Sequence, residues 1–516
     1  MFAALRHSAR FARVLWVLKR YGAWFAVRRL GPMPVPVRAL LALAALPAPG
    51  KAQQASEGKR LAEALTHLGP AYIKLGQTLA TRPDIVGPTI AADLGALQDK
   101  LPPFSDQAAR QAIEASLGKP IDALFSEFQP TPVAAASIAQ VHKAETAEGG
   151  KVAVKVVRPG IDAKFGRDLD AFAWAAKWAE RFSPEARRLR ASDVVETLRV
   201  GVLRELDLRL EAAAASELRE AMLGEPYYRV PQIDWHRTAR RVMTMEWVDG
   251  VPLSDRDALD AAGHDRREMA NRIVQIFLTQ AMRDGFFHAD LHQGNFLVES
   301  DGTLVALDFG IMGRLDRQAA LYLAEILWAF QERDYTRAAK GHFRAGYVPD
   351  DQSVADFAMA LRAIAEPVHD RPVEEISAGD LLAQLFATTA AFDMQTQPQL
   401  LMLQRSMVMV EGLAGYLDPK MNMWAASRPV IESWVREQYG LEAQAADAVL
   451  EAGRAAARLP DVAGAAVRLL ERAESDGLPI DPKSIAHLQP PRRPHPFIAG
   501  AVGAVIGALL VALWTV

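Results

Sequence analysis

A cluster of polar residues lies between apolar runs in the segment FFHADLHQGNFLV, residues 286–298. It contains Asp290 and Asn295, and Asp308-Phe309-Gly310 follows thirteen residues after Asn295, at the end of another apolar run. Buried polar and charged groups cost free energy unless they are paired or bind a ligand. The segment therefore requires a fold that buries it partly and a ligand that satisfies it.

A lysine far upstream belongs to the same pattern. Lys155 lies within VAVKVV, residues 152–157, a run that predicts a buried β-strand. An ammonium group there needs a carboxylate or phosphate partner. A strand lysine followed by D-x-x-x-x-N and then D-F-G is the set of residues that protein kinases use.

Each of these residue types suits one role in phosphoryl transfer. Lys155 would hold the α- and β-phosphates of ATP or ADP. Asn295 and Asp308 would bind Mg²⁺, which prefers oxygen ligands. Asp290 would orient or deprotonate the attacking hydroxyl or water. The predicted catalytic residues are therefore Asp290, Lys155, Asn295 and Asp308, and the predicted metal ligands are Asn295 and Asp308.

Other kinds of site are disfavoured. The chain has no cysteine, which excludes disulfides, thiolate metal sites and cysteine nucleophiles. Its net charge of −3 gives no general field for nucleic acid. His288 and His292 lack the same-face helical spacing of zinc ligands, so we expect them to brace the loop through hydrogen bonds.

Two kinase features are missing. Where a G-x-G-x-x-G loop would stand, residues 133–142 read VAAASIAQVH. In isolation this run favours the start of an alanine-rich helix; as a nucleotide loop it would be stiffer than glycine. No A-P-E follows the DFG, and IMGRLDRQAALYLAE, residues 311–325, is expected to enter a helix almost at once. An extended peptide-binding segment is therefore not expected.

These departures and two further motifs resemble the UbiB (AarF) family of atypical kinase-like proteins, over roughly residues 10–420. GPAYIKLGQTLATRPD, residues 69–84, resembles the family's K-x-G-Q segment, and LRELDLRLEAAAA, residues 203–215, resembles its E-x-D segment. The run at 133–142 resembles its alanine-rich loop. The segment at 286–298 resembles its catalytic loop, with His-Ala-Asp in place of His-Arg-Asp.

The resemblance assigns roles to these motifs. It implies that Glu211 pairs with Lys155, and that Glu205 and Asp207 meet Lys74 across the nucleotide cleft. By spacing alone, Lys74 and Gln77 share one helix face, as do Asp207 and Glu211, which also suits a solvated surface. The predicted nucleotide-binding residues are Val133, Ala134, Ala135, Ala136, Ser137, Ile138, Ala139, Gln140, Val141, Lys155, Glu211, Glu246 and Val248. The predicted regulatory residues are Lys74, Gln77, Glu205 and Asp207.

The resemblance also implies a function. It implies binding of ATP or ADP with Mg²⁺, and ATPase activity that supports ubiquinone (coenzyme Q) biosynthesis, with no defined phosphoryl acceptor. The implied partners are anionic phospholipid, polyprenylphenol or quinone precursors, and ubiquinone biosynthesis enzymes. Because the K-x-G-Q extension would cover the peptide site, ordinary protein kinase activity is not expected. The alternatives are a nucleotide-binding pseudokinase scaffold and a small-molecule phosphotransferase resembling aminoglycoside kinases.

The first fifty residues are basic and free of acidic residues, because the first acidic residue is Glu57. Aromatic and leucine residues are interleaved with the basic ones. The basic residues are Arg6, Arg10, Arg13, Lys19, Arg20, Arg28, Arg29 and Arg38. Three interpretations stay open: a basic amphipathic segment on an anionic membrane, a mitochondrial transit peptide, and an ordinary helix with a solvated basic face.

The C-terminal stretch 497–516 is uncharged. Twenty helical residues span ~30 Å, about the thickness of a bilayer core. Arg492 and Arg493 precede it, which predicts the bacterial cytoplasmic (inner) membrane with the catalytic part on the cytoplasmic side. The alternatives are the mitochondrial inner membrane, matrix side, and a buried C-terminal helix. Gly503 and Gly507 could pair two copies as a homodimer.

The expected fold class is α+β: an atypical bilobal protein-kinase-like fold with a small strand-bearing N-lobe and a helical C-lobe. Strands are expected at 152–157, 240–248 and 303–308, and helices over 163–223, 265–284 and 317–475. The expected segments are a membrane-facing segment (1–50), a helical extension with the K-x-G-Q motif (51–120), the N-lobe (121–250), the C-lobe (251–420), a helical tail with a Pro-rich linker (421–496) and a transmembrane helix (497–516).

Overall fold

The computed structural model describes the central part of the chain and portions of its N-terminal region. The described residues are 10, 13–25, 55–80, 86–95, 97, 102–182, 184–188, 190–369, 384, 387–388, 391–394 and 398–439. The chain divides into one compact unit over Met1–Val435 and a second over Arg436–Val516. The described helices and strands lie almost entirely in the first unit, and the α+β class is confirmed.

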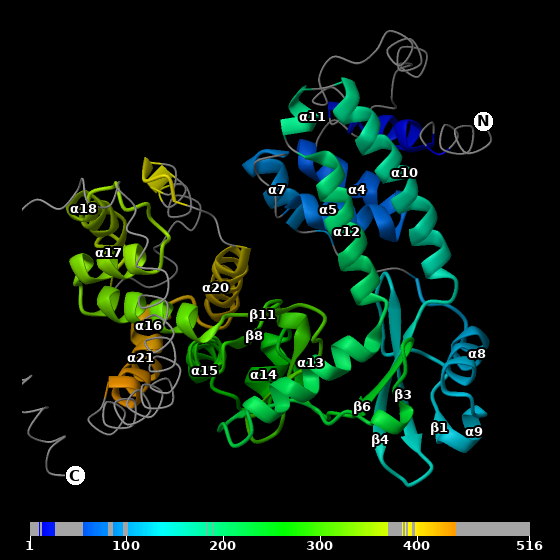
Figure 1. Cartoon of the computed structure of the whole chain (residues 1–516). Coiled ribbons are helices and arrows are strands. Elements are labelled where there is room, and N and C mark those ends of the chain that lie inside the picture. Colours follow the sequence, from blue (N-terminus) through cyan, green and yellow to red (C-terminus); the bar gives the residue numbers. More distant parts are fainter. Residues whose placement is uncertain are drawn as a thin grey trace, which may run out of the picture. The chain divides into compact units, whose positions relative to one another are not determined.

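The N-terminal extension is a group of helices. Its members are α4 (Glu57–Leu68), α5 (Pro70–Ala80), α7 (Pro88–Gly95), α10 (Ile161–Phe182) and α12 (Ala191–Glu205). α4, α5 and α7 contact one another, while α10 and α12 pack together and both contact α5 (Figure 1). The expected helical structure over 163–223 is present, and within it α10 ends at Phe182 before α11 (Pro184–Arg188) begins.

The N-terminal basic segment packs against the extension over its described residues. Leu15, Val17, Leu18 and Ala23 are buried in the same core as the extension helices. These four apolar side chains of residues 13–25 are therefore covered by the protein, whereas Trp16 is exposed. The basic side chains of this stretch lie half-buried or exposed, as in an ordinary packed helix. The membrane-facing role of residues 1–50 stays a prediction. Residues 26–54 lie outside the described part.

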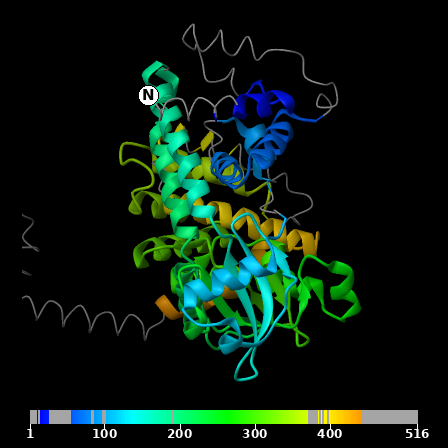
Figure 2. The same ribbon diagram turned by 90° about the vertical axis from the view of Figure 1, so that its right-hand side faces the viewer.

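A five-stranded antiparallel sheet forms the N-lobe. Its strands are β1 (Phe125–Phe128), β2 (Ala134–Ala135), β3 (Ala139–Thr146), β4 (Lys151–Val157) and β6 (Val242–Glu246), in the order β1-β3-β4-β6 with β2 beside β3. α8 (Asp106–Leu117) lies across one face (Figure 2). Its Ile113 shares a core with Val152, Val154 and Val156. Ala153 and Val157 join the main core instead, so β4 is buried on both faces. This explains the continuous apolar run in its sequence.

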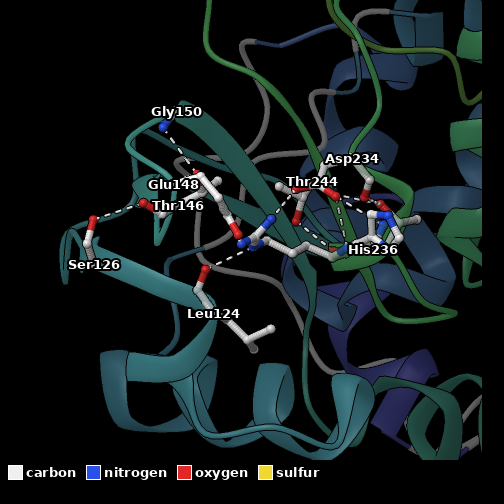
Figure 3. A network of polar contacts seen from close by, with 10 residues as sticks. Leu124, Ser126, Thr146, Glu148, Gly150, Asp234, His236 and Thr244 are labelled. Atoms are coloured by element: carbon white, nitrogen blue, oxygen red, sulfur yellow. Dashed lines mark hydrogen bonds and ion pairs between the residues drawn. The ribbon is translucent and has the colours of Figure 1, made fainter.

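A polar network fastens β6 to the opposite end of the sheet (Figure 3). Arg237 donates to the carbonyl of Leu124 at 2.8 Å and pairs with Asp234 at 2.8 Å and Glu148 at 2.6 Å. Thr244 on β6 donates to the carbonyl of Arg237 at 2.7 Å. These contacts join three loops far apart in sequence and hold the sheet's outer edge.

The C-lobe contains more strands than the one expected at 303–308. It contains a four-stranded sheet in the order β5-β10-β9-β7 and a two-stranded sheet of β8 and β11. The expected strand at 303–308 is present as β10. The strands are β5 (Tyr228–Arg229), β7 (Val251–Pro252), β8 (Phe286–His288), β9 (Phe296–Val298), β10 (Leu304–Ala306) and β11 (Met312–Arg314). These strands are two or three residues long, too short to show a periodic pattern.

The remaining described helices are α9 (Ile121–Leu124), α13 (Leu208–Ala221), α14 (Arg256–Ala261), α15 (Arg266–Thr279), α16 (Arg317–Gln331), α17 (Tyr335–Arg344), α18 (Val354–Ala365), α20 (Pro398–Leu417) and α21 (Met423–Tyr439). α15 continues as a π-helical turn over Gln280–Asp284, and Gly285 with φ +61° ends it. α16 begins seven residues after Gly310, so the expected early helix after the DFG is present.

Several membrane predictions fall outside the described residues. The stretch 497–516, with Gly503 and Gly507, lies there, as do Arg492 and the linker 480–496. Among the helices of the described residues, none combines the length and the apolar character that a bilayer crossing needs.

The contact between β8 and β11 predicts a sensitive glycine. Gly313 faces Phe287 across the strand pair, and a methyl group there would overlap the Phe287 ring, which is fully buried. We expect Gly313→Ala to lower the free energy of unfolding by ~1–3 kcal/mol through overpacking, measured by urea denaturation. Gly166→Ala in α10 is the matched control, because its added methyl group meets no neighbouring atom and should preserve or raise stability.

Candidate nucleotide and magnesium site

Lys155 forms the centre of the site. On β4 it lies on the strand face opposite Val154 and Val156, and its ammonium group reaches two carboxylates. Its Nζ is 2.5 Å from Oε1 of Glu211 on α13 and 3.2 Å from Oδ2 of Asp308. The expected ion pair with Glu211 is therefore present, and the lysine also bridges the N-lobe to the DFG aspartate.

The charges of this cluster are set by one another. Burial opposes the charge of Lys155, but Asp308 and Glu211 raise the pKa of its ammonium group above the usual value. Burial would likewise raise the pKa of Asp308, yet the charge of Lys155 and the N–H of Gly310 lower it to about 2. Burial raises the pKa of Glu211, with Lys155 acting against it. At neutral pH the site therefore holds an ammonium and an ionised DFG aspartate.

Two histidines brace the catalytic loop, as predicted. His288 is fully buried at the end of β8, and its Nε2 donates to the carbonyl of Asp308. Its Nδ1 accepts the N–H of Asp290 at 3.1 Å, which fixes the tautomer. His292 Nδ1 accepts the N–H of Gly294 at 2.8 Å. His288 thus ties the catalytic loop to the DFG segment, and burial lowers its pKa so that the ring stays neutral.

Asn295 and Asp308 offer oxygen ligands of the kind that Mg²⁺ requires. Asn295 Nδ2 donates to the carbonyl of Asp290 at 2.9 Å and to its carboxylate at 3.2 Å, so the amide oxygen is the atom left for a ligand. The Asp308 side chain is 44% exposed despite its contact with Lys155. The described residues hold no group of three or more acidic or histidine side chains that could bind a metal ion. Mg²⁺ is usually bound by one or two carboxylates together with substrate phosphates and water.

The alanine-rich segment is a hairpin, so the helix that its composition favours in isolation is wrong. Ala134 and Ala135 form β2, the turn runs through Ala136–Ile138, and β3 begins at Ala139. Pairing with β4 overrides the helical propensity of alanine. The hydroxyl of Ser137 at the turn is buried without a hydrogen-bond partner among the described residues. Such an orphaned group fits a loop whose hydrogen bonds are completed by a ligand.

Three predicted nucleotide-binding residues lie differently from the others. The Gln140 side chain is fully buried and bonds to the main chain of Phe104, so it does not line a cleft. The Glu246 carboxylate pairs with Arg229 at 3.0 Å, which leaves its main chain for any contact with a base. Val248 is buried at the end of the same segment. Their roles in nucleotide binding stay predictions.

An ion pair joins the K-x-G-Q and E-x-D segments. Lys74 Nζ on α5 is 2.8 Å from Oε2 of Glu205 at the end of α12. Asp207 has a different role, because it caps α13 and pairs with Arg209 at 2.6 Å. As the N-cap of α13, Asp207 uses its short side chain to accept the N–H of Arg209 at the start of that helix, which explains its different role. Gln77 Nε2 donates to the carbonyl of Leu97 at 3.5 Å, within the extension.

Sequence reasoning missed Gln280. It is fully buried in the π-helical turn, and its Oε1 accepts the N–H of His288 at 3.0 Å. It therefore supports the histidine that joins the catalytic loop to Asp308. A glutamine in the apolar run IVQIFLTQAM gave a weak signal, but the partner is eight residues away and only the turn brings them together.

Comparison with known proteins agrees with the kinase-like arrangement of the lysine, catalytic-loop and DFG residues. Residues 96–342 match the ABC1 atypical kinase-like domain, and residues 361–422 match the UbiB helical domain. The probable protein kinase UbiB of Marinobacter nauticus is 41% identical over 438 residues, covering 84% of this chain and 79% of that protein. The probable protein kinase UbiB of Aeromonas hydrophila is 43% identical over 398 residues, covering 76% and 73%.

A solved structure shows the same fold. The complex of Rv3197 with erythromycin from Mycobacterium tuberculosis matches with a TM-score of 0.53 and 26% identity, covering 77% of this chain and 98% of that one. Together with the strand lysine, the catalytic-loop residues and the DFG aspartate, this defines a protein-kinase-like protein. The chain belongs to the UbiB family of atypical kinase-like proteins.

The buried His288 predicts a pH dependence of stability. Its pKa is lowered in the folded protein, so the unfolded chain binds more protons below about pH 6.5, and stability falls as the pH drops through that range. We expect the urea midpoint to decrease from about pH 7.5 to about pH 5.5, and His288→Gln to show a smaller decrease. Equal decreases in both proteins would contradict this assignment. His292→Gln, on the exposed side of the loop, serves as the control.

Proposed function

We propose that this protein is a membrane-anchored atypical kinase/ATPase that binds Mg-ATP or Mg-ADP and supports ubiquinone biosynthesis. The observation that carries the proposal is the cluster of Lys155 with Glu211 and Asp308, beside Asn295. In protein kinases a strand lysine held by a helix carboxylate positions the phosphates, and the DFG aspartate holds the metal. Kinship with proteins named probable protein kinase UbiB supports the pathway.

The chain's own residues suit this chemistry. Lys155 is held in place by Glu211 and can turn from Asp308 to a phosphate oxygen when nucleotide binds. Asp308 and the amide oxygen of Asn295 would then hold Mg²⁺, which when bound neutralises charge on the phosphates. Asp290, fixed by His288 and Asn295, would orient or deprotonate the attacking hydroxyl or water.

Water or a small acceptor fits the site better than a protein substrate. Only six residues separate Gly310 from the start of α16, and three of them form β11, which pairs with β8. This leaves no extended segment of the kind on which kinases lay a peptide. We therefore propose ATP-driven handling of polyprenyl quinone precursors, or of the enzymes that modify them, rather than phosphorylation of proteins.

Membrane attachment is part of the proposal. It rests on the uncharged stretch 497–516 and the arginines before it, which indicate a bacterial inner-membrane anchor with the catalytic part on the cytoplasmic side. The proposed lipid partners are anionic phospholipid and a polyprenylphenol or quinone precursor.

The test is ATP hydrolysis by the purified full-length chain in anionic liposomes, with and without a polyprenylphenol. We expect turnover to rise with the lipid, and to fall by about 100-fold or more in Asp308→Asn and Lys155→Ala, because each removes a group that stabilises transferring phosphate. Asp351→Asn, an exposed carboxylate outside the site, should match the wild-type protein. No turnover in any condition, with Mg-nucleotide still raising the melting temperature, would favour a nucleotide-binding scaffold.

A further inference from the structure

Residues 102–104 link the N-terminal helices to the N-lobe, and two side chains bind them to the alanine-rich hairpin. Arg158, just after β4, donates from one terminal nitrogen to the carbonyl of Pro102 at 2.9 Å and to that of Ala136 at 3.4 Å. Its guanidinium lies over the Phe104 ring at 5.2 Å. The main-chain N–H of Arg158 donates to the carbonyl of Ile138 at 2.7 Å. One arginine therefore contacts both the turn of the hairpin and the linker.

Gln140 makes the second connection. Its Oε1 accepts the N–H of Phe104 at 3.0 Å, and its Nε2 donates to the carbonyl of Phe104 at 3.4 Å. With these two bonds the Gln140 amide pairs with both main-chain polar groups of Phe104, as a neighbouring β-strand would. Gln140 is the second residue of β3 and is fully buried, so water cannot take the place of these two hydrogen bonds if they are lost.

A buried histidine fixes the direction of that amide. Gln140 Nε2 lies 2.7 Å from Nε2 of His142, and His142 Nδ1 lies 2.8 Å from the carbonyl of Gln129. The carbonyl requires the proton on Nδ1, so Nε2 must accept from the glutamine. Burial lowers the pKa of His142, and Gln129 and Asp106 only partly oppose this, so the ring stays neutral. The glutamine oxygen is thereby aimed at Phe104.

The linker borders an open cavity of about 370 Å³. Pro102, Pro103 and Arg158 line this cavity together with Pro70 at the start of α5 and Lys164 on α10. Both prolines of the linker are exposed and neither can donate a hydrogen bond. Arg158 and Gln140 therefore hold the linker to the hairpin. Gln77 and Lys74 instead make their contacts within the extension, with Leu97 and Glu205.

We propose that Arg158 and Gln140 are positioning residues that brace the alanine-rich loop against the linker 102–104, and so set its grip on nucleotide. This rests on the proposed nucleotide-binding function of the same loop. A glycine-rich loop closes over phosphates by its own flexibility; here the shape of the loop is imposed by a segment that belongs to the extension. Anything that moves the extension would then alter nucleotide affinity through this contact.

The test compares three variants of the full-length chain. Arg158→Met and Gln140→Met remove the hydrogen bonds and keep the side-chain length. Arg237→Met is the matched control, since Arg237 also lies in the N-lobe, donates to a loop carbonyl at 2.8 Å and has its guanidinium 6.0 Å from a phenylalanine ring. Its contacts are with Leu124, Asp234 and Glu148 rather than with the linker or the hairpin turn (Figure 3).

Two measurements are made on each protein. Hydrogen exchange without nucleotide should become faster at residues 133–141 in Arg158→Met and Gln140→Met, and should stay unchanged there in Arg237→Met. The Kd for fluorescent Mg-ADP should rise about tenfold in the first two variants, the effect of losing roughly one well-placed hydrogen bond, and stay constant in the control. Melting temperatures should fall in all three.

The outcomes separate the brace from the wider function. Unchanged exchange at 133–141 in both loop variants, or equal changes in Arg237→Met, would overturn the brace whatever the nucleotide result. Faster exchange confined to the two loop variants with unchanged Kd would also overturn it, because the brace would not set affinity. If the wild-type protein binds no Mg-ADP, the proposed function fails while the exchange result still decides whether the linker holds the loop.

Discussion

A single buried ammonium group organises the centre of this protein. Lys155 stands on a strand with apolar neighbours on both sides, so its charge must be met by anions. It meets Glu211 from α13 and Asp308 from the C-lobe, and these contacts fix how the helix and the DFG segment approach the sheet. The same charge helps to keep the pKa of Asp308 low, so its carboxylate is ionised at neutral pH.

The catalytic loop depends on this arrangement through hydrogen bonds to main-chain atoms. The His288 ring bonds both to the N–H of Asp290 and to the carbonyl of Asp308. The main-chain N–H of His288 donates to the side-chain oxygen of Gln280. The catalytic loop and the DFG segment are therefore joined by one set of hydrogen bonds. The positions of Asp290 and Asn295 therefore depend on the hydrogen bond from the Asp290 N–H to His288 and on the bonds between Asn295 and Asp290.

Two described polar contacts of the N-terminal extension lie close to the site in the chain. Lys74 pairs with Glu205 at the end of α12, and α13, which carries Glu211, begins only three residues later. The linker 102–104 meets the alanine-rich hairpin through side chains of the N-lobe. The extension is therefore connected through described contacts to the neighbourhood of the lysine cluster and to the alanine-rich hairpin.

The sequence by itself determined the strand around Lys155, the catalytic-loop and DFG residues, their order and the family, because these depend on local composition and short spacings. Composition alone favoured a helix for the alanine-rich segment, whereas β-pairing makes it a hairpin and outweighs the helical propensity of alanine. It could not separate Glu205, which reaches Lys74, from Asp207, which caps its own helix. The Lys74–Glu205 pair and the contacts of Gln140 and Arg158 with residues 102–104 join residues tens of positions apart, so only the tertiary structure decided them.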